Sequence, residues 1–385
     1  MNRKAAIILG IVVVFVMCAW TVRGVKAQSN GSMPSAAQPG EKTAEQQFKN
    51  IQVLKGVPAD EVIPSMQFIT ASLGVECEFC HVRDAFDKDD KKTKKTARKM
   101  MEMMFAINKD NFNGHREVTC YSCHRGGVKP AGMPPVMTAE SMAAMTTAAP
   151  QKPDEQKTYT GPSADQLFDK YAQAAGGAAA IDKVTSRVMK GTIDFSGHAL
   201  PIDIYAKEPD MRISFTHTPD GDSVTAFNGH EGWLGAPNRP PREMHGGDID
   251  GASIDADLHL ATHLKQMFSE LKTDGPEKIG EHDAYEVVGR RDGKPPIELY
   301  FDAQSGLLLR MVRFGETALG RLPTQIDYAD YKDLDGVKIP YQWTLARPGG
   351  RFTITLNEAR QNVPVDDAKF AKPAAPAEGA KGPGE

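Results

Sequence analysis

The spacing of apolar and polar positions changes along this chain. In the first part, apolar residues recur three or four positions apart, as in Met66, Ile69 and Leu73. From Val188 onward they alternate with polar residues in short runs, as in residues 202–206. A period near 3.6 is typical of amphipathic helices, and a period of two is typical of half-buried strands. The pattern therefore predicts a multidomain protein, with a mostly α N-terminal domain followed by an antiparallel β (α+β) domain.

We expect three helices in the N-terminal part. Residues 44–54 can form the first. The second begins at Pro64, a residue favoured in the first helical turn, and ends at Gly74, a common C-terminal stop. The third covers residues 93–111, where one stripe carries Met100, Met103, Met104 and Ile107.

The C-terminal part is expected to begin with a helix over residues 164–177. Strands are then expected at residues 188–195, 202–206, 212–216, 284–288, 297–301, 307–312 and 351–356. Turn clusters such as residues 302–306 separate them, and such short gaps favour antiparallel pairing. One helix, over residues 257–271, is expected to interrupt the strands.

Composition marks the segments between these domains. Residues 1–27 combine basic residues, an apolar run and small residues before a cleavage point, which is typical of a secretory signal peptide. The apolar run is shorter than the ~20 residues that span a bilayer, so an uncleaved N-terminal anchor is the alternative. Residues 131–160, rich in Ala, Pro and Met, are expected to be a linker, and residues 374–385 a disordered tail.

These boundaries leave domains at residues 42–130 and 161–373. The signal predicts export to the periplasm, with anchoring to the inner membrane if the segment is retained. The formal net charge of −4 argues against a nucleic-acid-binding protein.

The chemistry of the chain is concentrated in two Cys-x-x-Cys-His motifs. They comprise Cys77, Cys80 and His81, and Cys120, Cys123 and His124. In such a motif the two thiols form thioether bonds to a haem, and the His that follows is the proximal iron ligand. The fifth cysteine, Cys18, lies in the predicted signal peptide. The sequence therefore predicts two covalently bound haem c groups.

Zinc and a redox disulfide are the rival interpretations of these cysteines. A zinc site would not need a His at the same place after each pair. A thioredoxin-like motif would need a βαβ context, which precedes neither pair.

Each iron needs a sixth ligand if the protein transfers electrons. Met66 lies on a helix that leads directly to Cys77, and we expect it to be the distal ligand of the first haem. Alignment of the two helices favours Met100 for the second haem, with Met103 and His115 as alternatives.

Residues 48–128 resemble the cytochrome c subunit of photosynthetic reaction centres. The resemblance is carried by residues 66–81 and by Met103, Asn108 and residues 118–126. In that family the two cysteines and the His of each motif bind a haem, and most haems take a helix Met as sixth ligand. The family subunit carries four haems, whereas this chain has two motifs. The distant His that serves the family's last haem has no counterpart here, so the sixth ligand of the second haem and any role in photosynthesis stay open.

Residues 164–372 resemble the half-barrel of outer-membrane lipoprotein-sorting and lipoprotein-carrier proteins. The similar segments are residues 228–233, 300–310 and 330–340. Such a sheet can hold acyl chains or another lipophilic ligand, or its apolar face can simply be core. His259 and His263 have a spacing that can bind a metal, but with no acidic residue between them we interpret them as a solvent-facing pair.

Together these features predict an exported dihaem cytochrome that carries single electrons between periplasmic or membrane redox partners, with a β domain for ligand or envelope interaction. Electron transfer favours a non-enzymatic role. One alternative is a haem oxidoreductase or peroxidase with one open haem; another is a lipophilic carrier with a cytochrome redox sensor. The basic run at residues 88–99 is either the solvated start of a helix or a docking patch for an acidic redox partner.

Overall fold

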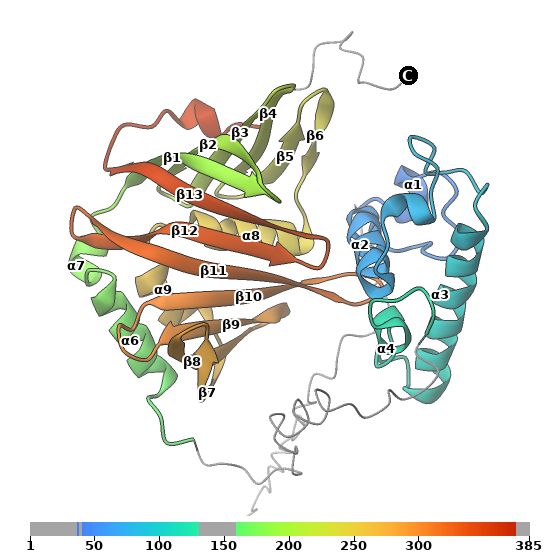
Figure 1. Cartoon of the computed structure of the whole chain (residues 1–385), viewed down its shortest axis with the longest axis horizontal. Helices are drawn as coiled ribbons and strands as arrows, with labels where there is room; N and C mark the ends of the chain where they lie inside the picture. The colour runs from blue at the N-terminus through green and yellow to red at the C-terminus, as the bar shows by residue number, and fades with distance from the viewer. Residues whose placement is uncertain (1–36, 38–40, 131–158, 375–385) are drawn as a thin grey trace, which may run out of the picture.

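The computed structural model describes residue 37, residues 41–130 and residues 159–374. The predicted signal peptide, nearly all of the predicted linker and residues 375–385 of the predicted tail lie outside the described residues. Figure 1 shows a helical N-terminal part beside a large curved sheet, which confirms the predicted fold class. No helix within the described ranges is long and apolar enough to cross a membrane.

The N-terminal part consists of short helices around two longer ones. Its elements are α1 (Ala44–Gln47), η1 (Ala59–Glu61), α2 (Val62–Leu73), η2 (Cys77–Phe79), α3 (Lys92–Asn111) and α4 (Cys120–His124). The predicted second and third helices are confirmed as α2 and α3 within two residues at each end. Gly74 closes α2 at φ 65°, a left-handed conformation that glycine adopts without steric cost.

The predicted first helix is too long. It ends at Gln47, and Asn50 takes a positive φ of 61°. The Asn50 side chain donates to the carbonyl of Asp87 at 2.5 Å and to the carboxylate of Asp89 at 2.9 Å. These tertiary hydrogen bonds override the helical pattern of residues 48–54.

The C-terminal part begins with α6 (Ala164–Ala174) and α7 (Ala178–Ile181) and continues as a sheet of 13 antiparallel strands. The strands are β1 (Ser186–Phe195), β2 (His198–Lys207), β3 (Met211–Thr218), β4 (Gly221–Asn228), β5 (Gly232–Ala236), β6 (Arg239–Glu243), β7 (Glu270–Ile279), β8 (His282–Arg291), β9 (Lys294–Asp302), β10 (Leu308–Glu316), β11 (Arg321–Leu334), β12 (Val337–Arg347) and β13 (Gly350–Gln361). Their order is β6-β5-β4-β3-β2-β1-β13-β12-β11-β10-β9-β8-β7, so the first and last strands pair in the middle.

Two helices, not one, interrupt the strands. They are α8 (Gly246–Ala256) and α9 (Leu260–Met267), and β7 already begins at Glu270. The predicted helix over residues 257–271 is therefore wrong at both ends. Asp257 takes an extended conformation and separates the two helices.

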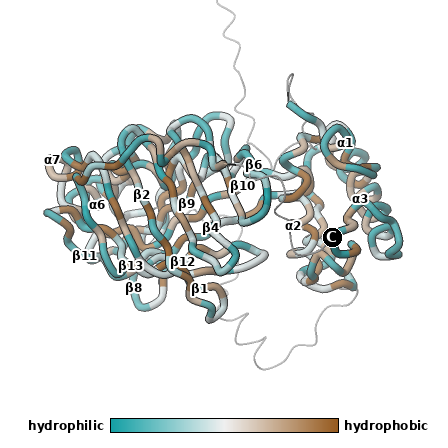
Figure 2. The backbone as a smooth tube through the Cα atoms, turned by 90° about the horizontal axis from the view of Figure 1, so that it is seen from above, coloured by the Kyte–Doolittle hydropathy of each residue, from teal (hydrophilic) through white to brown (hydrophobic). Residues whose placement is uncertain are grey.

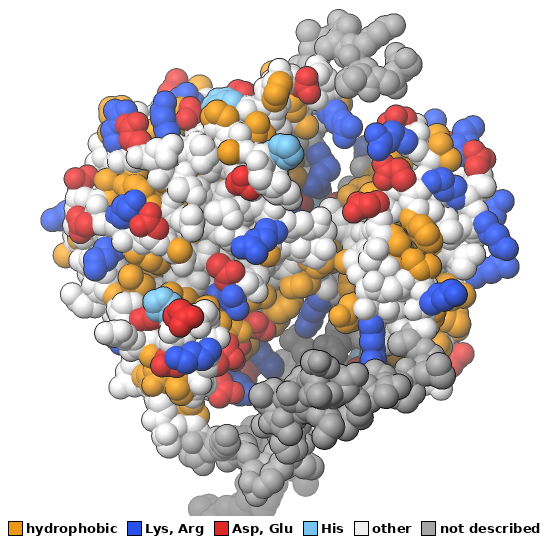
Figure 3. All heavy atoms as spheres, viewed as in Figure 1, with side chains coloured by type: hydrophobic (Ala, Val, Ile, Leu, Met, Phe, Trp, Pro, Cys, Tyr) orange, Lys and Arg blue, Asp and Glu red, His pale blue; other side chains and the backbone are white. Residues whose placement is uncertain are grey.

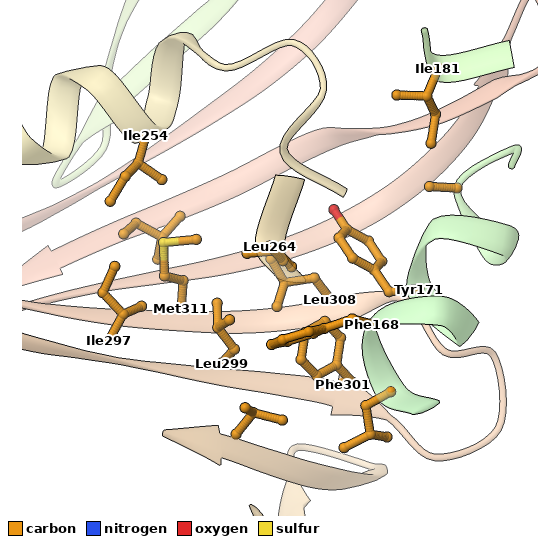
Figure 4. Close-up of a cluster of buried hydrophobic side chains, with 14 of the residues drawn as sticks. Phe168, Tyr171, Ile181, Ile254, Leu264, Ile297, Leu299, Phe301, Leu308 and Met311 are labelled. Carbon is orange, nitrogen blue, oxygen red and sulfur yellow. The ribbon is translucent and has the colours of Figure 1, made fainter. Parts of the chain in front are cut away.

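Helices α6 and α9 cover one face of the sheet. Phe168 and Tyr171 of α6 and Leu264 of α9 pack against Phe301 and Leu308 of the strands, as Figure 4 shows. The short helix η3 (Asp367–Phe370) contributes Phe370 to a smaller core on β3 and β4. The sheet is thus only partly covered, as expected for a half-barrel.

The loop between β10 and β11 joins the two parts of the molecule. Ala318 and Leu319 at its tip are buried in one cluster with Phe68, Met101 and Met104 of the helical part. Figure 2 shows the two parts side by side, with α2 on the side near the sheet and α3 farther from it. The sheet therefore supplies part of the core of the helical domain.

An ionic contact reinforces this junction. The buried guanidinium of Arg116 donates to the carbonyl of Thr317 at 2.6 Å and to the carboxylate of Glu316 at 2.6 Å. Hydrogen bonds that involve a charged group are stronger than neutral ones. The contact thus fixes the segment before the second motif against the β domain.

Candidate haem-binding site

The first motif forms a single tight turn. Cys77 and Cys80 lie at the start and end of the 3₁₀ turn η2, and the amide of His81 donates to the carbonyl of Cys77 at 3.0 Å. The Nδ1 of His81 donates to the carbonyl of Phe86 at 3.0 Å. This hydrogen bond places the ring proton on Nδ1, so Nε2 carries the lone pair that a metal ligand needs.

The loop that supplies this carbonyl is held by the predicted basic run. Lys94 is buried and donates to the carbonyls of Phe86 at 2.8 Å and Lys88 at 2.7 Å. Arg98 and Lys94 both pair with Asp89, at 2.8 Å and 3.2 Å, and hold the pKa of that carboxyl well below its usual range. Part of the basic run is therefore structural, which neither sequence interpretation anticipated.

The second motif repeats this arrangement on a short helix. It forms α4, and the amide of Thr119 donates to Ser122 Oγ at 3.0 Å, which fixes the helix start. The Nδ1 of His124 donates to the carbonyl of Gly127 at 3.0 Å. Both histidines thus have the same tautomer and keep Nε2 for a metal.

Asn108 positions the second motif, a role that sequence reasoning missed. Its side chain is fully buried, at 0% exposure. It accepts from the amides of Glu117 at 3.0 Å and Val118 at 2.9 Å, and it donates to the carbonyl of Val118 at 2.7 Å. The sequence did contain a signal for this role, since Asn108 lies on the inward face of an amphipathic helix. A buried polar side chain at such a position needs hydrogen-bond partners.

The two motif units meet at their backbones. The amide of Gly126 donates to the carbonyl of Ser72 at 2.9 Å. A Cβ on Gly74 would lie 2.3 Å from the carbonyl oxygen of Gly126, so only glycine fits there. The ends of α2 and α4 therefore pack directly together.

Burial favours the protonated form of one thiol in each motif. Burial raises the pKa of Cys80 and raises that of Cys120 to about 11. Redox-active Cys-x-x-Cys pairs and zinc sites use thiolates, and reactive thiols have lowered pKa values. Among the residues that the structure describes, the cysteines and histidines of the two motifs form no group of three with converging ligand atoms. The arrangement therefore fits thioether attachment better than zinc or disulfide chemistry.

Most of the exposed large apolar side chains lie in the helical part. The large hydrophobic residues that are exposed in the described helical part are Ile63, Phe79, Phe86, Met100, Met103, Phe112, Tyr121 and Val128, whereas Phe195 alone is exposed in the described sheet part. Figure 3 shows hydrophobic side chains on the surface of the helical part, between patches of Lys and Arg. A porphyrin is large and apolar, and such a concentration of exposed apolar residues marks a ligand site.

The candidate sixth ligands differ in their surroundings. Met66 lies on α2, half-buried against the cluster that contains Phe68. Met100 and Met103 are 40% and 49% exposed on α3. His115 lies exposed in the turn after α3. These positions do not distinguish among the three alternatives for the second haem.

The predicted stripe on α3 was partly wrong. Met104 does not share the exposed face of Met100 and Met103 but turns into the core with Met101 and Asn108. The reason is that four residues advance a helix by slightly more than one turn, which moves Met104 toward the inward face.

The His259 and His263 pair has an acidic neighbour that the sequence interpretation did not consider. Asp257 lies just before the helix, and its carboxylate bonds to His263 Nδ1 at 2.9 Å. The Nε2 of His259 donates to the carbonyl of Val184 at 2.8 Å. The amide of His259 also donates to Asp257, at 2.8 Å. The ligand atoms of Asp257, His259 and His263 lie within 4.8 Å of one another, so the three residues could hold a metal ion. The prediction of a solvent-facing pair is wrong for His259, whose side chain is 13% exposed.

Two Cys-x-x-Cys-His motifs with this geometry, in a small helical domain joined to an open antiparallel sheet, are the site of a c-type cytochrome. Comparison with known proteins agrees: residues 19–190 match the family of photosynthetic reaction centre cytochrome C subunits. The reaction center cytochrome c subunit of Thermochromatium tepidum is 35% identical over 116 residues, which cover 28% of this chain and 28% of that protein. The corresponding subunit of Roseobacter denitrificans is 32% identical over 104 residues, or 24% of this chain and 28% of that protein.

A third relative is cytochrome c-554 of Chloroflexus aurantiacus, 33% identical over 82 residues, or 20% of both chains. The matches thus span between a fifth and about a quarter of the length of these curated relatives. The predicted resemblance to the reaction centre cytochrome family is confirmed for the N-terminal part. The cofactor of a c-type cytochrome is covalently bound haem c.

Two solved structures are similar to about half of this chain. A domain of a putative outer membrane lipoprotein-sorting protein from Vibrio parahaemolyticus has a TM-score of 0.39 at 12% identity, and covers 53% of this chain and 97% of its own. A LolA superfamily protein from Nitrosomonas europaea has a TM-score of 0.37 at 13% identity, and covers 55% of this chain and 99% of its own.

Proposed function

We propose that this chain is an exported dihaem c-type cytochrome that carries single electrons between periplasmic or membrane redox partners, with a β domain for ligand or envelope interaction. The observation that carries the proposal is the repeated geometry of the two motifs. In each motif the Nδ1–H of the His donates to a backbone carbonyl at 3.0 Å, so that Nε2 is left to bind iron. The same motif carries two free thiols. Two equivalent motifs support two haem c groups.

Each residue of the motifs has a distinct part in this function. Cys77 and Cys80 hold one haem covalently, and Cys120 and Cys123 hold the other. His81 and His124 are the proximal ligands, fixed in orientation by their carbonyl partners. The haem supplies one-electron iron chemistry, and the protein sets its potential through ligands and burial.

Met66 is the distal ligand that we assign to the first haem, because α2 leads directly into the first motif and carries Met66 half-buried. For the second haem we assign Met100, with Met103 and His115 as alternatives. A thioether ligand raises the reduction potential relative to a second His.

A basic stripe suits an acidic redox partner. Lys92, Lys95 and Lys99 are exposed at spacings of three and four on α3. The first turn of α3 contacts the first motif, since Thr93 Oγ1 donates to the carbonyl of Phe79 at 2.6 Å. Charge complementarity of this kind mainly raises the rate of association.

Mass spectrometry of the mature protein from a host with haem-attachment machinery tests the proposal. We expect the mass of the chain plus two haems, and a first residue after Ala27 if the signal is cleaved. A double variant, Cys120→Ala with Cys123→Ala, should lose one haem and keep the other. A wild-type mass without haem would overturn the proposal.

A haem oxidoreductase or peroxidase with one open haem is the second candidate. The observation that favours it is the exposure of both Met100 and Met103, which are 40% and 49% exposed on α3. Carbon monoxide and cyanide distinguish the two functions: rapid binding to one haem supports an open site, and slow binding to both supports electron transfer.

A further inference from the structure

The concave face of the sheet borders a large cavity. Its volume is about 1730 Å³, and helix α8 and strands β1 to β4 and β10 to β13 contribute to its wall. It reaches the cytochrome part at Ile63 and Pro64 of α2. Its floor is apolar over Met189, Ile193, Leu200, Ile202, Phe227 and Ile354. A cavity of this size and lining accommodates a small molecule with an apolar body.

Two arginines interrupt this apolar surface at one end. Arg187 on β1 and Arg212 on β3 both pair with Ala206 on the strand between them. Directly opposed residues of antiparallel strands point to the same face, so both side chains line the cavity with only a methyl group between them. Two strand spacings separate their backbones by about 10 Å.

Neither guanidinium is hydrogen-bonded in the described part of the chain, although the carboxylate of Asp255 stabilises the charge of Arg212. No side-chain hydrogen bond or ion pair forms there for Arg187 or Arg212, and the Nε of Arg187 is buried without an acceptor. Burial lowers the pKa of Arg187 to about 10 and lowers that of Arg212, and both remain charged at neutral pH. A cation without an ion-pair partner in an apolar cavity is unfavourable, so a bound anion would stabilise this pair of arginines.

The neighbouring acids are already engaged. Asp255 pairs with a third arginine, Arg313, at 2.9 Å, and Arg313 also donates to the carbonyl of Gly251 at 2.8 Å. Asp257 pairs with His263 at 2.9 Å. Asp255, shared with Arg313, therefore balances the charge of Arg212 only in part, and neither acid pairs with Arg187.

We propose that the cavity binds an amphiphile with one anionic headgroup, a carboxylate or a phosphate, which lies between Arg187 and Arg212. Its apolar chain runs over the floor from Met189 toward Ile193. Strand β1 extends about 20 Å from Arg187 to Ile193, which is room for a long alkyl chain. Guanidinium groups match the geometry of carboxylate and phosphate oxygens.

Titration calorimetry on the full haem-loaded chain tests this proposal with decanoate and with decanol, which has the same chain and no charge. We expect decanoate to bind at least tenfold more tightly than decanol. Arg187→Gln and Arg212→Gln should each weaken decanoate binding about tenfold and leave decanol binding unchanged. Decyl phosphate, run in parallel, shows which of the two anionic headgroups binds more tightly.

Arg360→Gln is the matched control. Arg360 lies on β13 of the same sheet outside the cavity, exposed and paired with Glu358, and its loss should change neither affinity. Equal binding of decanoate and decanol, no binding of decanoate, or unchanged decanoate binding in both variants would overturn the proposal. If a variant fails to fold, competition on the wild-type chain decides: inorganic phosphate should displace decanoate and not decanol. The haem spectrum is independent of these outcomes, so failure here leaves the proposed electron transfer intact.

Discussion

At the scale of single residues, one buried amide determines how the second motif is presented. Asn108 lies two turns of α3 beyond Met101 and satisfies three backbone groups of the segment that leads to Cys120. Those groups belong to Glu117 and Val118, where no regular element supplies partners. The side chain thus replaces secondary structure at this point.

Replacing Asn108 with Ala should lower the free energy of unfolding by about 2 kcal/mol, because the amide and the carbonyl of Val118 lose their Asn108 partner. The absorption of the second haem should also change. Asn111→Ala is the control, since Asn111 is exposed on the same helix and donates to the carbonyl of Ile107 at 3.1 Å. Urea denaturation measures the free energy of unfolding of both variants. Equal stabilities of the two variants would refute the positioning role.

Met66→Ala should lower the potential of the first haem on the order of 0.1 V, within the ~0.8 V range that axial ligands cover. It should also abolish the charge-transfer band from the Met sulfur to ferric iron. Met101→Leu is the control, because Met101 is buried in the same cluster and a Leu of similar volume keeps its packing. An unchanged spectrum in Met66→Ala would exclude this ligand. Spectroelectrochemistry supplies both readouts.

Met100→Ala and Met103→Ala, made separately, should differ in their effect on the second haem. Only the residue that binds iron should lower its potential, since each iron has one remaining axial position. If neither variant changes the spectrum, His115 or an external ligand is the sixth ligand. Redox titration of each variant gives the result.

At the scale of elements, the loop between β10 and β11 is closely packed against the helical part. Gly320 at its tip lies against the ring of Phe68, and a Cβ there would come within 2.3 Å of Cε2. Gly320→Ala should therefore destabilise the protein by about 1–3 kcal/mol through overpacking.

Gly349→Ala is the matched control for this loop. Gly349 lies in the turn between β12 and β13, where an added Cβ would meet no atom within 4 Å, so the substitution should be nearly neutral. Chemical denaturation compares the two variants. A neutral Gly320→Ala would mean that Phe68 moves aside without loss of packing.

The sequence predicted elements where local pattern decides the structure. Helix α2 ends at Gly74 as expected, and the alternating runs became strands. The helix predicted over residues 48–54 does not form, because the Asn50 side chain is hydrogen-bonded to Asp87 and Asp89, which lie far along the chain. Contacts of this kind leave no periodic trace in a sequence.

The candidate haem site, too, could be predicted from the sequence only in part. The residues of the two motifs are identified by their spacing alone. Their orienting partners are the backbone carbonyls of Phe86 and Gly127, which any residue could supply, so no side-chain pattern reveals them. Arg187 and Arg212 lie on the same face only because strand register places each of them opposite Ala206. A slip of one residue would move one arginine to the other face of the sheet.

At the scale of the whole molecule, the two domains meet around a cluster of acids. Glu61 at the start of α2 lies largely buried near Glu316 of the β domain, and Glu316 pairs with the guanidinium of Arg116. Burial, with Asp60 and Glu316 as further causes, raises the pKa of Glu61 to about 7 from an ordinary value of 4.5. The junction therefore takes up a proton near neutral pH.

This proton uptake predicts a pH-dependent stability. Between pH 4.5 and about 7 the folded chain keeps a proton on Glu61 that the unfolded chain has released. Stability falls with rising pH wherever the folded state binds more protons, so this contribution is complete below pH 4.5 and is lost as pH rises through about 7. Solvent reaches part of the carboxyl and screens it, which limits the loss to on the order of 1 kcal/mol.

Glu61→Gln should remove this dependence, because the amide stays neutral at every pH. Relative to wild type, the variant should gain on the order of 1 kcal/mol at pH 8 and little at pH 4. Urea denaturation at both pH values measures the difference, and Glu102→Gln, exposed on α3, is the control for loss of a carboxylate. A difference between Glu61→Gln and wild type that is the same at both pH values would mean that Glu61 ionises alike in the folded and unfolded chains, and that the acids at the domain junction do not couple assembly to pH.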